Sequence, residues 1–233
     1  MSLKLNMLPP SVNNMSVRVF VRAAGLPFEE ENVWGKTQEQ EYLAKIPSGL
    51  TPSVETPELP KGGLWESCAV MMYLADREGL DDLYPTDLKR RAMVNSANFY
   101  TMSMLYPLVA RATYPRLSFA GYPGEVATSE ASDDDKEAAR KSAEDALASI
   151  LAVYPQFFGT DGGFIGGGDG PTIADIRLAC TLEFLSVMDT DLPAWATDYV
   201  QRVESALGES YSEPAGDVRG YIAQVTGEAV AAG

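Results

Sequence analysis

Strand-like patterns occur only in the first 80 of the 233 residues, and this restriction limits the fold more than any other feature. Leu3, Leu5 and Met7 alternate with polar residues, which is the period of a half-buried strand. Short apolar runs and helical patterns then follow in the order helix, strand, helix, strand, strand, helix. A strand–helix–strand unit in one sheet requires a parallel pair with a right-handed crossover. Residues 1–80 are therefore expected to form a small α/β domain.

Beyond residue 80 only helical patterns remain. Leu88 to about Leu117 is long enough for one helix, and Pro107 is expected to bend it. Further helices are predicted at about 143–154, 173–187 and 194–207, with a weaker one at 216–232. We therefore expect an α/β domain over residues 1–80, a linker over 81–87 and an all-helical domain over 88–233.

The composition excludes several kinds of chemistry. The chain has no histidine, which rules out a Ser-His-Asp triad, a Cys-His pair and a histidine-ligated zinc. Its two cysteines, Cys68 and Cys180, are too few for a cysteine-based zinc site, an iron–sulfur cluster or a disulfide scaffold. No metal site is expected, and reduced thiols are the simpler interpretation of the two cysteines.

The charge and hydropathy limit the partners. A net charge of −15 and a pI of about 4.4 would repel nucleic acid and anionic membrane surfaces. No apolar run approaches the ~18 residues of a membrane-spanning helix, and the first residues lack the pattern of a signal peptide. The expectation is a cytoplasmic protein without a nucleic-acid or membrane partner.

Four motifs occur in a fixed order along the chain. They are Ser48–Val54 with Pro52 inside it, the pair Glu66-Ser67, the run Leu83–Pro85 followed by Asp87, Arg91 and Ala92, and Thr172–Asp175. They resemble, in order and spacing, the cis-proline signature, the acidic-serine pair, the interdomain linker and the Ser/Thr-Ile-Ala-Asp box of the cytosolic glutathione transferase superfamily. Each motif is weak alone, but the ordered set covers both expected domains.

The resemblance implies a fold, a co-substrate and an activity. The fold would be a thioredoxin-like α/β N-terminal domain followed by an all-α C-terminal domain. The activity would be conjugation of the glutathione thiolate to a small hydrophobic electrophile in a cytoplasmic, homodimeric detoxification enzyme. Other glutathione-dependent reactions on the same site, such as dehalogenation, peroxide reduction or isomerisation, remain alternatives, as does a non-catalytic binding protein of the family.

Glu66 and Ser67 suit the γ-glutamyl end of glutathione, which carries an ammonium and a carboxylate. Glu66 can neutralise the ammonium, and the Ser67 hydroxyl and N–H, at a helix N-terminus, can bind the carboxylate. The alternative is that both residues only cap the helix. Free N–H groups at a helix start serve either purpose, so we expect both roles.

The segment around Pro52 is expected to bind the extended part of the tripeptide. The family resemblance implies a cis bond between Thr51 and Pro52, which would turn the Thr51 N–H and C=O outward to pair with a peptide as an added strand does. Trp34, Lys36 and Lys45 are the nearest candidates for the glycine carboxylate of glutathione, with solvated surface roles as the alternative.

Ser11 is the expected catalytic residue. A thiolate is the nucleophilic form of a thiol, so a donor directed at the glutathione sulfur favours the reaction. Family members place Tyr, Ser or Cys just after the first strand; this chain has neither Tyr nor Cys there, and Pro9–Ser16 resembles the serine-type loop of delta-, theta- and nu-like members. Asn13 is a second possible donor. The alternative is that Ser11 or Asn13 simply caps the following helix.

The second substrate would lie between the domains. The first C-terminal helix offers soft and aromatic side chains suited to an apolar electrophile, namely Met102, Met104, Tyr106, Tyr114 and Phe119. Packing in the core or in a dimer is the alternative for most of them. Thr172 and Asp175 have the spacing of a capping box, so Asp175 is expected to be structural.

Overall fold

A four-stranded mixed sheet forms one end of the molecule. The structure, a computed structural model, describes residues 3–119 and 131–227. The strands are β1 (Leu3–Met7), β2 (Phe28–Asn32), β3 (Ser53–Glu55) and β4 (Gly63–Trp65), arranged in the order β2-β1-β3-β4. β1 and β2 are parallel, whereas β3 is antiparallel to both β1 and β4. The parallel pair joined through a helix confirms the arrangement predicted from the sequence.

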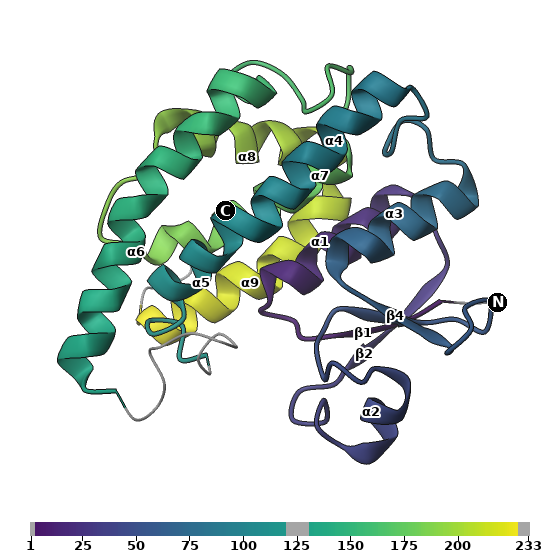
Figure 1. The fold of residues 1–233 in the computed structure, drawn as a ribbon, viewed down its shortest axis with the longest axis horizontal. Coiled ribbons are helices and arrows are strands. Elements are labelled where there is room, and N and C mark those ends of the chain that lie inside the picture. The colour runs from purple at the N-terminus through teal and green to yellow at the C-terminus, as the bar shows by residue number, and fades with distance from the viewer. Residues whose placement is uncertain (1–2, 120–130, 228–233) are drawn as a thin grey trace.

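The remaining secondary structure of the described residues is helical. Three alternate with the strands: α1 (Val12–Ala23), α2 (Gln40–Lys45) and α3 (Ser67–Glu78). The others are α4 (Leu88–Tyr100), α5 (Tyr106–Thr113), α6 (Asp133–Val153), α7 (Ile173–Glu183), α8 (Ala194–Leu207) and α9 (Glu209–Thr226). They gather on the side of α1 and α3 away from α2 (Figure 1). No helix of the described ranges is both long and apolar enough to cross a bilayer.

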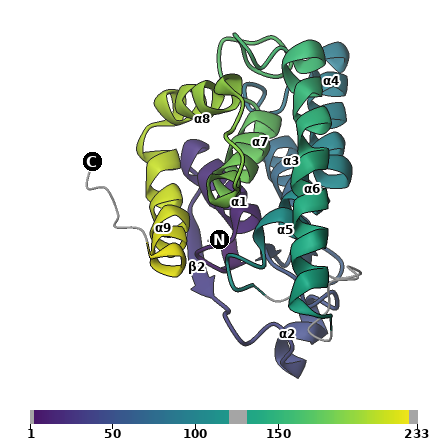
Figure 2. The ribbon, with the colours of Figure 1, turned by 90° about the vertical axis from the view of Figure 1, so that its left-hand side faces the viewer.

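α7 lies at the centre of the helical region. Its neighbours are α1, α3, α4, α8 and α9, while α6 runs along one outer side of the helical region (Figure 2). Every residue from Ile173 to Leu182 is buried, including the charged Asp175 and Arg177. A helix that is buried on all sides can carry charged groups only where each has a specific partner, so these two residues need an explanation.

The helix predicted over 88–117 is bent where proline interrupts it. α4 and α5 are joined by a π-helical segment, η1 (Thr101–Leu105), directly before Pro107. A second π-helical segment, η2 (Tyr154–Phe158), contains Pro155 and ends α6. Proline lacks an N–H and its ring clashes with the preceding turn, so a widened turn is a common accommodation. Met102 of η1 contacts Arg177 of α7 (3.2 Å), and Tyr106 of α5 contacts Asn13 of α1 (2.6 Å).

The segment between α3 and α4 is held to both sides. The Arg91 guanidinium lies over the Tyr84 ring, 4.0 Å from its centroid, and donates to Asp76 at the end of α3 (2.9 Å). The carbonyl of Leu83 accepts a hydrogen bond from the N–H of Ile173 at the start of α7 (2.9 Å). These contacts hold the segment between α3 and α4 to α3 on one side and to α4 and α7 on the other.

A second set of ion pairs joins the sheet to the last helix. Arg18 of α1, only 3% exposed, lies 2.8 Å from Glu30 of β2 and 2.8 Å from Asp217 of α9. Arg22 also reaches Glu30 (2.7 Å) and, on α9, Glu213 (3.0 Å). A buried arginine paired with two carboxylates is compensated for leaving water, so α9 is anchored to the sheet side of the molecule.

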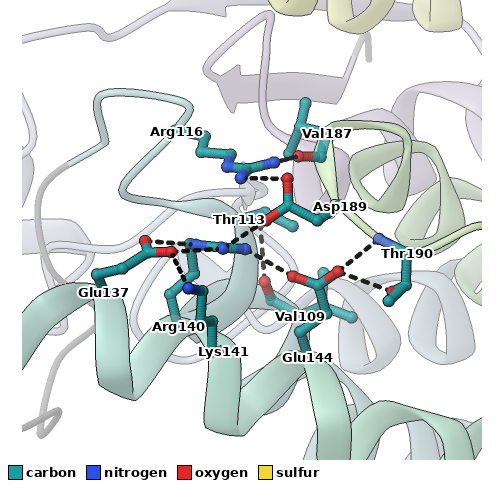
Figure 3. Close-up of polar contacts among 10 residues, drawn as sticks. All are labelled: Val109, Thr113, Arg116, Glu137, Arg140, Lys141, Glu144, Val187, Asp189 and Thr190. Atoms are coloured by element: carbon teal, nitrogen blue, oxygen red, sulfur yellow. Dashed lines mark hydrogen bonds and ion pairs between the residues drawn. The ribbon is translucent and has the colours of Figure 1, made fainter.

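A third cluster surrounds the buried Arg140 of α6 (Figure 3). Its guanidinium contacts Glu137 (2.8 Å), Glu144 (2.6 Å) and Asp189 (2.7 Å). Glu144 also accepts from the N–H and the hydroxyl of Thr190, each at 2.7 Å. Burial alone would raise the pKa of Glu144, but the hydrogen bonds from Thr190 and Arg140 outweigh it and lower that pKa. The cluster therefore holds α6 to the 187–190 segment with ionised groups.

Replacing Glu144 with alanine is expected to destabilise the protein by about 3 kcal/mol, because it leaves the Thr190 N–H and part of a buried cation unpaired. Urea unfolding at neutral pH measures the loss. Glu137→Ala, which removes an exposed partner of the same arginine, is the matched control and should cost clearly less. Folding lowers the pKa of Glu144. Its contribution to stability should therefore be full above the pKa of an ordinary glutamate and should be lost as the pH falls from there through the lowered pKa. Equal losses for the two variants would contradict the role assigned to Glu144.

Candidate active site

A cavity of about 480 Å³ opens between the sheet and the helices. Its size is within the range of small-molecule sites. The lining comes from five separate parts of the chain: Leu8, Pro10, Ser11, Asn13, Trp34, Thr37, Gly49, Leu50, Thr51, Pro52, Glu66, Ser67, Met102, Tyr106, Tyr114 and Phe119. Of the site residues predicted from the sequence, all except Lys36, Lys45 and Met104 are among them.

Ser11 lies where β1 passes into α1. Pro9 and Pro10 follow the strand, and Ser11 is the N-cap residue of α1, in an extended conformation. Its carbonyl accepts the N–H of Met15 (2.8 Å), but its side chain makes no capping hydrogen bond. The half-buried hydroxyl therefore lines the cavity at the positive end of the helix dipole without a helical partner.

Asn13 is held by side chains from two other helices. Its Nδ2 donates to the Tyr106 hydroxyl of α5 (2.6 Å), and its Oδ1 accepts a short hydrogen bond from Arg177 of α7. The Tyr106 hydroxyl in turn lies 2.6 Å from that of Tyr114. Asn13 thus caps no helix; it belongs to a polar chain that runs from α7 to the cavity wall.

The bond between Thr51 and Pro52 is cis, as the family resemblance implied. Thr51 is fixed to α1, because its hydroxyl accepts from Asn14 Nδ2 (3.1 Å). Tyr42 holds the other side of the loop: its hydroxyl donates to the Leu50 carbonyl (2.7 Å). The segment before β3 is therefore supported by helices on both sides where it faces the cavity.

Glu66 and Ser67 begin α3 with unused hydrogen-bonding groups. Glu66 is the N-cap residue, has a φ of 70° and makes no side-chain capping hydrogen bond. Ser67 is 2% exposed, and its Oγ has no hydrogen-bond partner among the described residues. A left-handed backbone at a non-glycine residue and a buried unpaired hydroxyl are both costly, and such features concentrate at functional sites. Both groups are available to a molecule in the cavity.

Trp34 and the two lysines have different positions. Trp34 is 53% exposed at the rim of the cavity, with its ring 6.5 Å from that of Tyr221 on α9. Lys45 is not a lining residue: it faces a separate cavity of about 190 Å³ and pairs with Glu55 (2.7 Å). Lys36 faces the same small cavity, 3.8 Å from Glu31. The geometry therefore does not bring Lys45 to the other predicted residues.

The opposite wall is apolar. Met102, Tyr106, Tyr114 and Phe119 line it, as predicted for the second substrate. Tyr114 and Phe119 pack edge to face with their centroids 5.2 Å apart. Met104 is instead 46% exposed and lies outside the lining. Met104 is two residues from both Met102 and Tyr106, which is about half a helical turn, so its side chain points to the other side of the segment.

Sequence reasoning missed Arg177, which touches three residues of the cavity wall. A signal existed: Arg177 is a single cation within the apolar run from Ile173 to Leu182. A charged residue that interrupts an otherwise buried helix requires a partner. The sequence alone did not show that this partner would be Asn13.

The cysteines do not contribute to the lining. Cys68 and Cys180 are both buried and carry free thiols. Burial raises the pKa of both thiols, which keeps them protonated and unreactive at neutral pH. Cys68 lies 3.7 Å from Asn98 Oδ1 inside the protein. It is core material, as expected from its apolar helix.

Comparison with solved structures finds the same fold in several proteins. Glutathione transferase BmGSTD1 of Bombyx mori is 23% identical, with a TM-score of 0.75 over 98% of both chains. Human glutathione S-transferase T1-1, in its apo form, is 21% identical, with a TM-score of 0.77 over 97% of this chain and 91% of that one. Human glutathione transferase theta-2, in complex with glutathione, is 21% identical, with a TM-score of 0.76 over 97% of this chain and 89% of that one.

Two family models match the sequence itself. The glutathione S-transferase N-terminal domain matches residues 1–76, and the glutathione S-transferase C-terminal domain matches residues 133–203. The two matches are in the order of the family and together span more than half of the chain. This protein therefore belongs to the glutathione transferases, enzymes that use glutathione as their co-substrate.

Proposed function

We propose that the protein conjugates the thiolate of glutathione to a small hydrophobic electrophile in the cavity between the sheet and the helices. Residues 1–80 would form the glutathione-binding domain, residues 81–87 the linker, and residues 88–233 the helical domain that lines the electrophile pocket. Family membership supports a cytoplasmic enzyme of detoxification.

The single observation that supports the proposal best is the convergence of two helix N-termini on one cavity. Neither Ser11 at the start of α1 nor Glu66 at the start of α3 makes a side-chain capping hydrogen bond, and the Ser67 Oγ is buried without a partner. Helix N-termini attract anions. Glutathione has a carboxylate at each end and a thiol between them, so it can use both termini.

The γ-glutamyl group fits the start of α3. Its carboxylate would accept from the Ser67 hydroxyl and the first N–H groups of the helix, and its ammonium would pair with Glu66. Glu66 is the only carboxylate among the described lining residues, so it is the natural partner of that ammonium. The extended part of the tripeptide would pair with the Thr51 backbone, with Trp34 at the rim beside the glycine end.

Ser11 would act on the sulfur. Its hydroxyl can donate to a thiolate, which stabilises the nucleophilic form without any proton-accepting side chain. In the reaction the sulfur bonds to the electrophilic carbon and the leaving group departs with the electron pair. Met102, Tyr114 and Phe119 give the electrophile an apolar, polarisable wall.

We also propose that a second copy of the chain covers the outer face of α4 and η1. Three large apolar side chains are exposed there, Leu88 (81%), Phe99 (64%) and Met104 (46%). Leu88 and Phe99 are eleven residues apart, or about three helical turns, so they lie on one side of α4. Exposed apolar residues that share a face favour association. A homodimer is common in the family to which the chain belongs.

Turnover with glutathione and a chlorodinitrobenzene tests the proposal. We expect release of chloride and formation of the thioether at a rate that saturates with glutathione. Retention on glutathione resin without turnover over a broad panel of electrophiles would instead make the protein a non-catalytic binder. Turnover of peroxides or haloacids without conjugation would replace conjugation by another glutathione-dependent reaction.

Glu66→Gln should weaken glutathione binding by about tenfold to a hundredfold, since a hydrogen bond between charged groups contributes about 1.5–3 kcal/mol. Calorimetric titration with glutathione measures the change. Glu29→Gln removes the same charge from an exposed position on β2, outside the cavity, and should leave the dissociation constant unchanged. Equal affinities of wild type and Glu66→Gln would remove Glu66 from the γ-glutamyl site.

A further inference from the structure

Arg177 is a buried cation directly behind the cavity wall. It is 0% exposed and lies in the middle of α7. Its guanidinium donates to Asn13 Oδ1, to the Thr181 hydroxyl (2.7 Å) and to Met102 Sδ (3.2 Å), and lies 5.1 Å from the centre of the Tyr106 ring. Three of these four partners, Asn13, Met102 and Tyr106, line the cavity.

No carboxylate of the described residues lies within 4.0 Å of this guanidinium. The contrast with Arg140 is direct: that arginine is equally buried but pairs with Glu137, Glu144 and Asp189. A buried charge without a counter-ion costs several kcal/mol. Neutral acceptors and an aromatic face reduce this cost for Arg177, but they do not neutralise its charge.

The cavity supplies the place where a counter-ion can enter. Among the described residues that line it there is one carboxylate, Glu66, and no lysine or arginine. Glutathione carries two carboxylates and, when ionised, a thiolate. Arg177 is therefore a cation in direct contact with the described lining. It contacts the lining at Asn13, two residues after Ser11.

Arg177 also determines which way the Asn13 amide points. A guanidinium can only donate hydrogen bonds, so it must face the Oδ1 of Asn13. The Nδ2 is consequently directed at the Tyr106 hydroxyl (2.6 Å) on the cavity wall. The NH2 group of the Asn13 amide, which carries partial positive charge, therefore faces the cavity wall, and its oxygen faces the buried arginine.

We propose that Arg177 is a positioning residue for the conjugation reaction: it fixes the orientation of the Asn13 amide and supplies the positive charge that favours a thiolate beside Ser11. The inference rests on the proposed function, since it concerns the sulfur of bound glutathione. Ionisation breaks only the S–H bond, and the proton leaves to water.

The buried thiols and the Tyr154 phenol near Arg177 keep their protons at neutral pH, because burial raises the pKa of each. The titratable side chains nearest to Arg177 by contact or charge are Cys68, Tyr106, Tyr154 and Cys180. Burial raises the pKa of Cys68, Tyr154 and Cys180, and the Arg177 charge only partly opposes it. On the helices around α7, the charged groups have other partners: Arg18 pairs with Glu30, Asp175 accepts from Tyr199, and Glu183 pairs with Arg219.

The test is the pH titration of the thiol of bound glutathione, followed by the ultraviolet absorbance of the thiolate. Arg177→Met, a neutral residue of similar length, should raise the apparent pKa of this thiol by about one pH unit, the lower end of the effect of a nearby opposite charge. Arg177→Lys, which keeps the charge, should restore most of the shift. A lysine variant that behaves as the methionine variant does would contradict the electrostatic role.

Asn13→Asp provides a readout that a purely structural role would not produce. The new carboxylate gives Arg177 its missing counter-ion, so the variant should unfold at a higher temperature while its bound thiol ionises at a higher pH and its kcat falls at neutral pH. Asn13→Asp keeps the arginine, so it still tests the electrostatic role of Arg177 if Arg177→Met fails to fold.

Two outcomes separate this inference from the proposed function. If glutathione binds and is turned over but the thiol titrates at the same pH in wild type, Arg177→Met and Asn13→Asp, the inference is overturned and the function stands. If wild type shows no glutathione binding by calorimetry, the proposed function fails first, and the inference fails with it.

Discussion

Ser11→Ala should lower kcat/KM for conjugation of glutathione to a chlorodinitrobenzene by about a hundredfold, with little change in the dissociation constant of glutathione. The loss of one preorganised donor to a developing or full negative charge typically costs about 100- to 1,000-fold in rate. The Ser11 hydroxyl is half-buried, lines the cavity and is not used by the helix it begins. Its removal therefore exposes no unpaired group in the protein and should leave the fold intact.

The pH dependence of kcat/KM provides a second, independent test of the role of Ser11. Without the donor, the rise of kcat/KM with pH should move toward the pKa of a free thiol, about 8.5. Ser16→Ala is the matched control, because it removes a hydroxyl from the same helix that bonds only to the Asn13 carbonyl (2.8 Å) and lies outside the cavity lining. If Ser11→Ala keeps activity within about twofold of wild type, Ser11 does not act on the sulfur.

Asp175→Ala should destabilise the protein by about 4 kcal/mol, the largest stability effect expected from any single substitution discussed. The carboxylate is fully buried and accepts from the N–H of Ile165 (2.8 Å), the N–H and hydroxyl of Thr172 (both 2.7 Å) and the hydroxyl of Tyr199 (2.5 Å). The hydrogen bond from the Thr172 N–H is one half of a capping box at the start of α7. Alanine removes the carboxylate acceptor of four buried donors, of which only the Thr172 hydroxyl has another acceptor, the Ile165 carbonyl at 3.5 Å.

Guanidinium unfolding of wild type and variant measures this loss. Asp191→Ala, an exposed aspartate in the segment before α8, is the control and should change stability by less than about 0.5 kcal/mol. Glutathione affinity at a temperature where the variant is folded should be unchanged, because Asp175 does not line the cavity. A variant as stable as wild type would refute the structural role of Asp175.

The same residue gives stability a pH dependence of defined sign. Burial raises the pKa of Asp175 to about 6, although its four hydrogen bonds oppose the change. A carboxyl with a raised folded-state pKa binds its proton more tightly in the native state, so its contribution is full at about pH 4 and is lost as the pH rises through 6. The stability advantage of wild type over Asp175→Asn should therefore shrink between about pH 4 and pH 6. If the advantage of wild type instead grows over this range, the hydrogen bonds affect the pKa of Asp175 more than burial does, and the pKa is lowered.

Local sequence patterns predicted the sheet end of the fold well. The alternation of Leu3, Leu5 and Met7 and the breakers Pro9 and Pro10 are short-range signals, and they identify β1 and the start of α1. The last helix was predicted from residue 216 but begins at Glu209, and it contains Pro214 in its second turn. The buried Tyr211, in line with later apolar residues, holds that first turn against the core. Tertiary packing outweighed local propensity there.

The candidate site was predictable where one residue type at one helix start determines the chemistry. Ser11, Glu66 and Ser67 were named from the family resemblance at such positions, and all three line the cavity. Lys45 was chosen for charge alone, yet its partner Glu55 comes from a strand ten residues later, and their pairing directs the ammonium away from the cavity. Arg177 and Asn13 meet across 164 residues of chain. Contacts of that separation follow from how the helices pack, which no local pattern records.

The absence of histidine is compatible with this site. The proposed nucleophile arrives with the co-substrate, and a hydroxyl, a helix N-terminus and a buried arginine can favour its ionised form without an imidazole base. Glutathione is itself anionic, and the positive ends of α1 and α3 offset the strongly acidic character of the chain at the point where it would bind.

Calorimetric titration of the wild-type protein with glutathione is the most direct test of the central claim that this cavity is a glutathione site. We predict saturable binding of one glutathione per chain, weakened by Glu66→Gln and unaffected by Glu29→Gln. Absence of binding heat at several temperatures, together with no retention on glutathione resin, would contradict the account.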